Sequence, residues 1–415
     1  MKILLANKFF FQKGGAETVF FQERKYLLNQ GNSIIDFSMI HPNNITSPYA
    51  DFFVPNVEYR ERSNNNRIKR LLKNALIASS FIHNKKAVQN IKRLIDKEKP
   101  DIAHLHNVYH QITPSIISVL QKAGVRVILT LHDYKIVCPN YLMLSNGNIC
   151  QKCEGRNFWH AYSNCCEQGD FAGSFLLAVE AYWHKFFKSY EYVDLFLAPS
   201  QFMADIAARF RINAKKIRVL HNGIDTGQFT VTEADEGYAL YFGRISREKG
   251  IETLLHAHSR LESRIPVKVV GTGPLLENLR QKFKQVSFMG YRGGQELREI
   301  IQKASLVVVP SEWYENCSMV VLESMALGKP VIGAKIGGIP EQIDDGKTGY
   351  LFEAGNIRDL ALKMDLLARD KKLRREMGRN ARAKLEKKYS LDDHNKKLVS
   401  LYKELLGAKE KSQIS

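Results

Sequence analysis

Two glutamates, Glu315 and Glu323, lie eight positions apart where a loop pattern changes into a helix pattern. The β-branched run at 305–309 predicts a buried strand that ends at Pro310, and the helix pattern that follows ends at Gly328. Ligands bind at the carboxyl ends of parallel strands, and a helix that begins there offers free N–H groups to phosphate. Carboxylates bind sugar hydroxyls, so two of them beside a phosphate seat predict a nucleotide-sugar site.

The residues around these glutamates carry a family resemblance. The alternative is an ion-paired face of a surface helix, because chance pairs of glutamates are common. However, the stretches WYEN and VVLESMALGKPVIG resemble one branch of the retaining glycosyltransferases of family 4, which carry two glutamates at this spacing. The resemblance implies that Glu315 holds hydroxyls of the donor sugar and Glu323 holds the ribose. It also implies donor contacts by Asn316, Cys317 and Ser318, although many members have Phe-Gly at the first two of these positions.

A loop in the second half of the chain predicts a site for a diphosphate. Gly243 follows an apolar run, and Arg244 and Lys249 flank the short loop that leads into the next helix pattern. Arginine binds two phosphate oxygens at once, whereas lysine acts as a point charge. An ordinary basic surface loop is the alternative. The order Gly-Arg, four residues, Lys-Gly matches the diphosphate loop of family 4, which implies that Arg244 and Lys249 are catalytic and that Gly243 contacts the donor.

Further candidate residues are implied by the same resemblance. Gly14 and Gly15 open a helix pattern after the first strand, where family 4 has a glycine loop beside the diphosphate. His132 ends a strand run, and the family often has a histidine there beside the donor sugar, although such a histidine can also merely cap a strand. Tyr291 and Arg292 lie in a stretch that resembles the base-binding region, which makes them candidate donor contacts.

The cysteines are clustered, with five of the six between Cys138 and Cys166. The Cys-x-x-Cys pair Cys150 and Cys153, together with Cys138 and Cys165, has the composition of a tetrahedral structural zinc site. Reduced thiols without a ligand and redox chemistry are the alternatives. Four thiolates leave no open coordination position, so a catalytic metal is not expected at the cysteines. The family resemblance implies that no cofactor takes part in catalysis.

The chain has 415 residues and a net charge of +18, which predicts two domains and an anionic partner. No zinc-finger, helix-turn-helix or RNP pattern is present, so a nucleic acid is not the expected partner. Segment 60–99 holds twelve basic and three acidic residues. Within it, Ile68, Leu71 and Leu76 share one helical face opposite basic residues, which predicts contact with an anionic membrane surface. A helix packed on its own domain with a solvated basic face is the alternative.

The candidate residues must be positioned by parallel sheets, because apolar strand runs alternate with helix patterns along the whole chain. The predicted strands are 2–6, 33–37, 101–105, 126–131, 193–198, 217–220, 238–242, 267–270, 286–289, 305–309 and 331–333. They define an N-terminal Rossmann-like domain at 1–226 with a cysteine-rich insertion at 138–166, and a C-terminal Rossmann-like domain at 227–388. Two such domains facing across a cleft, with a helix at 389–408 crossing back to the first, form the GT-B fold that the resemblance implies.

The chain is expected in the cytosol. No apolar run reaches the ~18 residues that span a bilayer, and the first residues, MKILLANKFFF, are interrupted by polar ones and predict a strand rather than a signal peptide. With the basic segment, this indicates a peripheral protein on the inner face of the plasma membrane.

The resemblance covers almost the whole chain and implies a retaining, metal-independent glycosyltransferase. Such an enzyme moves a hexose from a nucleoside diphosphate sugar to a hydroxyl of a glycan or polyprenyl-diphosphate-linked acceptor, as in cell-surface polysaccharide synthesis. Two other functions remain open. A nucleotide-sugar epimerase has the same architecture, and a non-enzymatic protein that binds membranes through basic residues would explain the charge alone.

Overall fold

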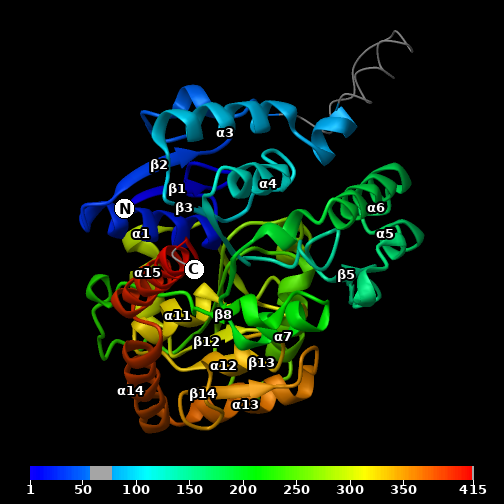
Figure 1. Ribbon diagram of the computed structural model, residues 1–415. Coiled ribbons are helices and arrows are strands. Elements are labelled where there is room, and N and C mark those ends of the chain that lie inside the picture. The colour runs from blue at the N-terminus through cyan, green and yellow to red at the C-terminus, as the bar shows by residue number, and fades with distance from the viewer. Residues whose placement is uncertain (57–76, 414–415) are drawn as a thin grey trace.

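The computed structural model describes residues 1–56 and 77–413, and most of this chain folds around two parallel sheets of six strands each (Figure 1). The first sheet has the strand order β2-β1-β3-β4-β7-β8, and the second has the order β11-β10-β9-β12-β13-β14. Helices connect the strands and cover both faces of each sheet (Figure 1). The prediction of two Rossmann-like parallel-sheet domains is therefore confirmed.

The observed strands follow the predicted ones closely. Those of the first sheet are β1 (Lys2–Ala6), β2 (Ser33–Phe37), β3 (Ile102–Leu105), β4 (Arg126–Thr130), β7 (Leu195–Ala198) and β8 (Ile217–Val219). Those of the second are β9 (Ala239–Phe242), β10 (Val267–Val270), β11 (Ser287–Gly290), β12 (Leu306–Val309), β13 (Val331–Ala334) and β14 (Gly349–Phe352). The sequence runs predict all of these strands except β14, which directly follows a turn.

Helices alternate with these strands along the chain. In the first half they are α1 (Gly15–Asn29), α3 (Lys85–Glu98), α4 (Ser115–Lys122), α5 (Trp159–Ser163), α6 (Phe171–Phe186) and α7 (Gln201–Arg209). In the second half they are α8 (Ile251–His258), α9 (Leu276–Lys282), α10 (Gly294–Lys303), α11 (Met319–Ala326), α12 (Ile339–Gln342), α13 (Ile357–Arg369), α14 (Lys371–Lys388) and α15 (Leu391–Gln413). None of the helices in the described ranges is long and apolar enough to cross a membrane.

Helix α3 shows how the basic segment packs. The side chain of Asn84 caps the helix by accepting the N–H of Ala87, and Ile91, Leu94 and Ile95 are buried against the first domain. The basic residues of α3 remain exposed. This half of segment 60–99 is therefore a domain helix with a solvated basic face. The amphipathic pattern predicted around Ile68 lies outside the described residues.

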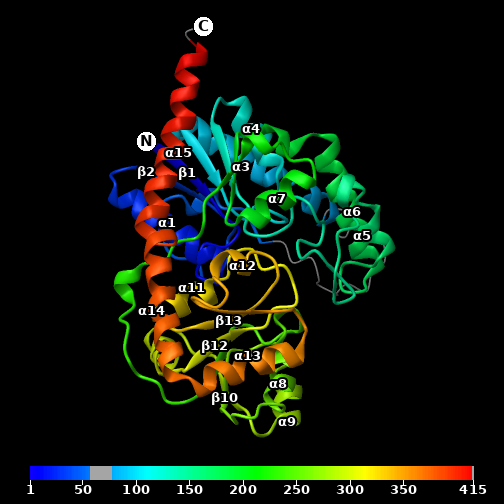
Figure 2. The same ribbon diagram turned by 90° about the horizontal axis from the view of Figure 1, so that it is seen from below.

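Helix α15 crosses back from the second domain to the first, as the sequence predicts (Figure 2). Leu398 and Tyr402 are fully buried in the core of the first domain. At the start of the crossing, the backbone of Ile224 accepts from Leu391 and donates to Tyr389. The crossing helix thus ties the two domains together on the side opposite the insertion.

The cysteine-rich insertion at 138–166 contains little regular structure. It forms the two-residue strands β5 (Leu144–Ser145) and β6 (Asn148–Ile149), followed by α5. The Gln151 side chain donates to the hydroxyl of Tyr314 in the second domain at 2.5 Å. The insertion therefore reaches across to the second domain at the edge of the space between the sheets.

Candidate active site

The two sheets face each other across a cavity of about 540 Å³, a volume typical of small-molecule sites. Loops at the carboxyl ends of strands in both sheets form its walls, which is where parallel sheets bind ligands. Ten of the predicted catalytic and donor-binding residues line this one cavity: Gly14, Gly15, His132, Gly243, Arg244, Lys249, Glu315, Asn316, Cys317 and Ser318.

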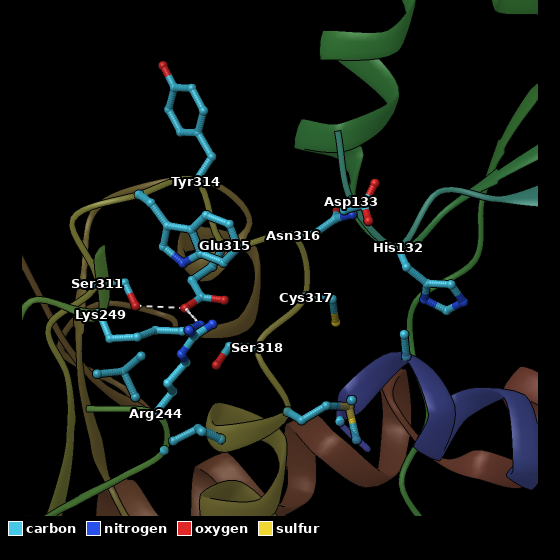
Figure 3. Close-up of a pocket in the computed structure, with 18 of the residues that line it drawn as sticks. His132, Asp133, Arg244, Lys249, Ser311, Tyr314, Glu315, Asn316, Cys317 and Ser318 are labelled. Carbon is cyan, nitrogen blue, oxygen red and sulfur yellow. Dashed lines mark hydrogen bonds and ion pairs between the residues drawn. The ribbon is translucent and has the colours of Figure 1, made fainter. Parts of the chain in front are cut away.

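An ion pair lies at the centre of the cavity wall. Lys249 Nζ is 2.6 Å from Glu315 Oε1, which also accepts a hydrogen bond from Ser311 Oγ at 2.8 Å (Figure 3). Burial alone would raise the pKa of Glu315, but the charge of Lys249 and hydrogen bonds from Lys249, Trp313 and Ser311 lower it. The carboxylate is therefore ionised and held in one orientation, ready to accept hydrogen bonds from sugar hydroxyls.

Glycines bring the loops that carry this pair together. Gly250 has φ +66°, and a Cβ there would lie 1.8 Å from the carbonyl oxygen of Pro310. Gly337 has φ +60°, and a Cβ there would lie 2.3 Å from the carbonyl oxygen of Glu315, which accepts the N–H of Gly338. The loops around Lys249 and Glu315 therefore pack backbone to backbone, and no side chain could be accommodated between them.

Two further cations face the cavity from opposite domains. The exposed Arg244 extends toward the Lys249–Glu315 pair (Figure 3). Lys13 lies on the other wall, and its pKa is lowered by burial and by the charge of Arg244, against the attraction of Glu17. Two like charges held near each other favour an anion between them. The sequence motifs did not predict Lys13 as a site residue, although it directly precedes the glycine pair.

The first turn of α11 completes this positive wall. Ser318 is the N-cap residue but its side chain makes no capping bond, and its own N–H donates to Gln342 Oε1 at 2.9 Å. Met319 and Val320 line the cavity next to it. Because the first N–H groups of a helix have no partner within it, this end is suited to an anionic group. Burial raises the pKa of the Cys317 thiol to about 12, so Cys317 is a neutral part of the wall.

His132, on the opposite wall, belongs to a buried chain of histidines. Its Nε2 lies 2.7 Å from His106 Nδ1, and burial and His106 lower its pKa to about 3. His106 and His104 lie 3.5 and 3.4 Å from Glu23 Oε2, and His394 on α15 lies 3.0 Å from Glu23 Oε1. The resemblance to family 4 assigns no role to Glu23 or His106. These contacts connect a neutral imidazole in the cavity to the helix that crosses between the domains.

Asp133 is a second residue that motif analysis did not select. It lines the cavity next to His132, opposite the cationic wall (Figure 3). Burial raises its pKa to about 7, although its carboxylate accepts the N–H of Lys135 at 2.9 Å. The neighbouring Asn316 connects the two walls, because its amide donates to the Leu131 carbonyl and its Oδ1 accepts from Ser200. The side chain of Asn316 is therefore used in a contact between the domains.

Three predicted donor contacts lie off the walls of this cavity. Tyr291 is 73% exposed, and Arg292 forms an ion pair with Glu296 at 2.7 Å. Glu323 lies more than a turn into α11, where burial raises its pKa to about 7 against the attraction of Arg298. The structure therefore does not bring these three residues into the cavity with the other candidates.

The cysteines gather around a second, much smaller cavity of about 10 Å³. Cys138, Cys150, Cys153 and Cys166 line it, and the predicted fourth residue, Cys165, does not. All are free thiols. A volume of this size holds one small sphere, and four sulfurs are the donor set of structural zinc. In the described ranges, only Glu23, His104 and His106 bring three ligand atoms within 4.8 Å of one another, so the sulfurs would have to move closer to bind an ion.

Two facing Rossmann-like sheets with a cationic cavity between them define the GT-B class of glycosyltransferases, and solved structures of this class match nearly the whole chain. HepE from Anabaena in complex with UDP-glucose aligns with a TM-score of 0.67 and 17% identity, covering 97% of this chain and 100% of that one. Sucrose-phosphate synthase from Thermosynechococcus elongatus aligns with a TM-score of 0.71 and 20% identity, covering 98% and 99%.

The chain belongs to glycosyltransferase family 4. The profile of that family, "Glycosyltransferase Family 4", matches residues 13–228, and the profile "Glycosyl transferases group 1" matches residues 227–384. The sulfoquinovosyl transferase SQD2 of Arabidopsis thaliana is 33% identical over 214 residues, 47% of this chain and 41% of that protein. The alpha-D-kanosaminyltransferase of Streptomyces kanamyceticus is 29% identical over 180 residues, 41% of this chain and 46% of that protein. The aligned parts thus make up about half of these relatives.

Proposed function

We propose that the protein transfers a hexose from a nucleoside diphosphate sugar to a hydroxyl group of a glycan acceptor, with retention of the anomeric configuration. The observation that carries this proposal is the convergence of Arg244, Lys249 and Lys13 on the cavity that also holds the ionised Glu315. Cations beside a helix N-terminus bind a diphosphate, and a carboxylate beside them binds sugar hydroxyls. Family membership supports the same activity.

The chemistry proposed for this cavity needs charge stabilisation more than proton transfer. The bond between the sugar C1 and the diphosphate oxygen breaks, and the acceptor oxygen bonds to C1 on the same face. The acceptor proton passes to the departing phosphate oxygen. Negative charge grows on the diphosphate during this step, and Arg244 and Lys249 would stabilise it without a metal ion. We place the acceptor against Asp133, on the wall opposite these cations, with His132 beside the donor sugar as the family resemblance implies.

The test begins with donor binding. A thermal-shift screen of UDP and GDP sugars, with UDP-glucose as the first probe, should raise the Tm for the true donor, because ligands stabilise the folded state by mass action. Arg244→Ala should lower kcat roughly 100- to 1000-fold while leaving the fold intact. The matched control is Arg260→Ala, an exposed arginine of the same domain outside the cavity. Near-normal turnover by the Arg244 variant would contradict the proposed site.

The same samples separate the proposed transfer from the two alternative functions. An epimerase would convert the donor with no acceptor present, which ¹H NMR of the sugar nucleotide detects. A non-enzymatic binder would show no Tm shift with any sugar nucleotide. Retention is tested by the anomeric coupling constant of the product, and an inverted product would overturn that part of the proposal.

We also propose that the acceptor is a polyprenyl-diphosphate-linked glycan at the inner face of the plasma membrane, in the synthesis of a cell-surface polysaccharide. The net charge of +18 and the basic excess in 60–99 support an anionic, membrane-bound acceptor. Transfer to a lipid-linked acceptor in detergent should weaken with salt more steeply than transfer to a short soluble glycan. Equal salt dependence of the two reactions would count against the lipid-linked acceptor.

For the cysteines we propose structural zinc held by Cys138, Cys150, Cys153 and Cys166. The four thiols around one small cavity support this set, and Cys165 provides a neighbouring control. Protein purified from zinc-supplemented cells should contain one equivalent of zinc by mass spectrometry, Cys166→Ser should lose it, and Cys165→Ser should keep it. Wild-type protein without zinc, or with disulfides among these cysteines, would overturn the assignment.

A further inference from the structure

Helix α6 buries Leu177 and Ala178 together with three polar side chains, and it exposes several aromatic ones. Ser174, Glu180 and His184 are buried, with exposed fractions of 3% or less. The aromatic residues of the same helix face outward, and Phe171 is 64% and Phe186 is 78% exposed. A helix of a globular protein normally buries its apolar side chains and exposes its polar ones. The exposed aromatic side of α6 is therefore suited to contact with a binding partner rather than with water.

The buried polar residues of α6 have partners inside the domain. Glu180 Oε2 is 2.5 Å from Lys135 Nζ, and His184 Nδ1 lies 2.9 Å from Ser189 Oγ. The buried pairs fix the rotation of the helix, because turning it outward would leave Lys135 buried without its carboxylate. The outward position of the aromatic side chains is thus set by this packing.

The outward side chains of α5, α6 and the residue that follows α6 include six aromatic residues, which we define as the aromatic surface: Trp159, Phe171, Phe175, Trp183, Phe186 and Phe187. Each is at least 40% exposed. Phe171, Phe175, Trp183 and Phe186 fall within roughly 120° of the helix circumference at 3.6 residues per turn. Trp159 packs 6.3 Å from Phe175, and Phe187 packs 4.5 Å from Trp183 between ring centroids. Large exposed apolar patches mark interaction sites.

We propose that the aromatic surface of α5 and α6 docks the protein into the interfacial region of an anionic lipid bilayer. Tryptophan and phenylalanine are side chains that bind this region, where their rings lie at the level of the headgroups. Exposed Lys185 and Lys188 follow Trp183 in the sequence, and Lys188 lies 3.9 Å from the exposed Glu191. The ring of Trp183 also lies 6.5 Å from that of His83, which directly precedes the exposed basic face of α3. Aromatic side chains beside lysines are complementary to an anionic lipid surface rather than to the apolar face of a second protein.

The surface is placed to serve the proposed function, on which this inference rests for its biological purpose. Helices α5 and α6 extend from the first domain on the same side as the insertion, whose Gln151 contacts Tyr314 at the edge of the cavity (Figure 1). A lipid-linked acceptor held in the same bilayer would approach the wall that carries His132 and Asp133. Docking by α6 would thus present that wall to the membrane surface.

Flotation of the full-length protein with vesicles tests the proposal. The vesicles contain equal parts of phosphatidylglycerol and phosphatidylcholine, and the variant is Phe171→Ser with Phe186→Ser. The wild type should float with the vesicles, and the variant should bind roughly tenfold or more weakly because two aromatic rings no longer leave water. Leu362→Ser with Leu366→Ser is the matched control, since both leucines are at least 50% exposed on α13 of the other domain. Brominated lipids should quench tryptophan fluorescence in the wild type.

Three outcomes would overturn the proposal: equal flotation of variant and wild type, a wild type that does not bind the vesicles, or a dimer in light scattering that the Phe171 and Phe186 substitutions dissolve. The last result would assign the surface to a second copy of the chain. The Tm shift of each variant with the sugar nucleotide gives a separate measurement. A variant that loses flotation and keeps its donor-induced Tm shift supports docking, whereas a wild type that floats without any donor-induced shift leaves docking intact and contradicts the enzymatic function.

Discussion

At the scale of single residues, the site depends on how Lys249 and Glu315 share a partly buried ion pair. The pair orients a carboxylate for sugar hydroxyls and leaves part of the ammonium available for phosphate. The side chain of Lys249 is 28% exposed and that of Glu315 is 11% exposed. Solvent therefore screens the pair only in part, and the charge of Lys249 favours the ionised form of Glu315.

Removing Lys249 should therefore cost stability as well as activity. We expect Lys249→Ala to lower the free energy of unfolding by about 2 kcal/mol, less than the about 3–5 kcal/mol typical of a fully buried pair. Lys249→Ala with Glu315→Gln should regain most of this stability, because no charge is left unpaired, and should stay inactive. Denaturant titration of both variants measures the free energy of unfolding. A double variant no more stable than the single one would contradict the cost assigned to the unpaired Glu315 carboxylate.

Glu323 should make the stability of the protein depend on pH. Its pKa in the folded protein is raised from 4.5 to about 7, so its stabilising contribution is complete below pH 4.5 and is lost as the pH rises through 7. Glu323→Gln remains neutral at every pH. We expect the variant to gain Tm relative to the wild type as the pH rises from about 4.5 to 7, and the difference to level off above that, as measured by thermal denaturation in a buffer series. A constant difference across this range would contradict the raised pKa.

The proposed contact of Glu323 with the ribose should make donor affinity depend on pH in the direction opposite to stability. An ionised carboxylate accepts hydrogen bonds from both ribose hydroxyls, so binding of the nucleotide would require proton loss below the folded pKa of about 7. Affinity for the donor should then rise between about pH 6 and 8 in the wild type and stay flat in Glu323→Gln. Calorimetry in two buffers of different ionisation enthalpy would detect the released proton, and no proton release would place the ribose elsewhere.

At the scale of elements, the sequence predicts the parts whose determinants are local. The β-branched run before Pro310 and the helix pattern that ends at Gly328 predict β12 and α11, because strand and helix periodicity are local properties. The choice between Cys165 and Cys166 could not be predicted, since adjacent residues in an irregular segment point in directions set by tertiary packing. Lys13 was missed for a similar reason: its role depends on Arg244 in the other domain.

Substitution of Gly337 should cost more stability than its backbone angle alone predicts, because its loop packs against the loop of Glu315. Gly337 and Gly346 have similar φ values of +60° and +74°, but a Cβ on Gly346 meets nothing within 4 Å. Gly346→Ala should cost about 1–2 kcal/mol for the left-handed conformation. Gly337→Ala should cost roughly 3 kcal/mol or more and lower activity, because the loop of Glu315 must move. Equal costs in denaturant titrations would show that the loop moves freely.

The contact between α15 and Glu23 should also make the thermal stability of the protein depend on pH. Burial opposes ionisation, but His104, His106 and His394 hold the pKa of Glu23 well below 4.5, and Glu23 raises the pKa of His394 above 6.5. The first effect is lost as the pH falls below 4.5, and the second as it rises above 6.5. Glu23→Gln should therefore lower the Tm most near pH 6 and less near pH 9, and a loss that is the same at both would contradict the charged contact.

At the scale of the whole molecule, the two domains meet through contacts that no sequence motif predicts. Asn316 bonds to Leu131, Gln151 bonds to Tyr314, and Glu341 bonds to the start of α7, each joining segments more than a hundred residues apart. Such pairs depend on the relative placement of two separately folded sheets. The sequence can therefore predict two facing domains and most of the cavity lining, but not the contacts that set how closely the domains approach.

Glu341 should control the closure of the cavity. Its carboxylate accepts the N–H groups of Gln201 at 2.8 Å and Phe202 at 2.7 Å, so an acid of the second domain caps helix α7 of the first. A carboxylate at a helix N-terminus contributes about 0.3–1 kcal/mol, up to ~2 kcal/mol when partly buried, and here that energy favours the closed arrangement. We expect Glu341→Ala to raise the donor KM severalfold and to increase the radius of gyration in X-ray scattering, with little change in Tm. Glu277→Ala, an exposed acid in the same domain, is the control. A variant with unchanged scattering and unchanged KM would show that the crossing helices and the other contacts between the domains hold the closed arrangement without Glu341.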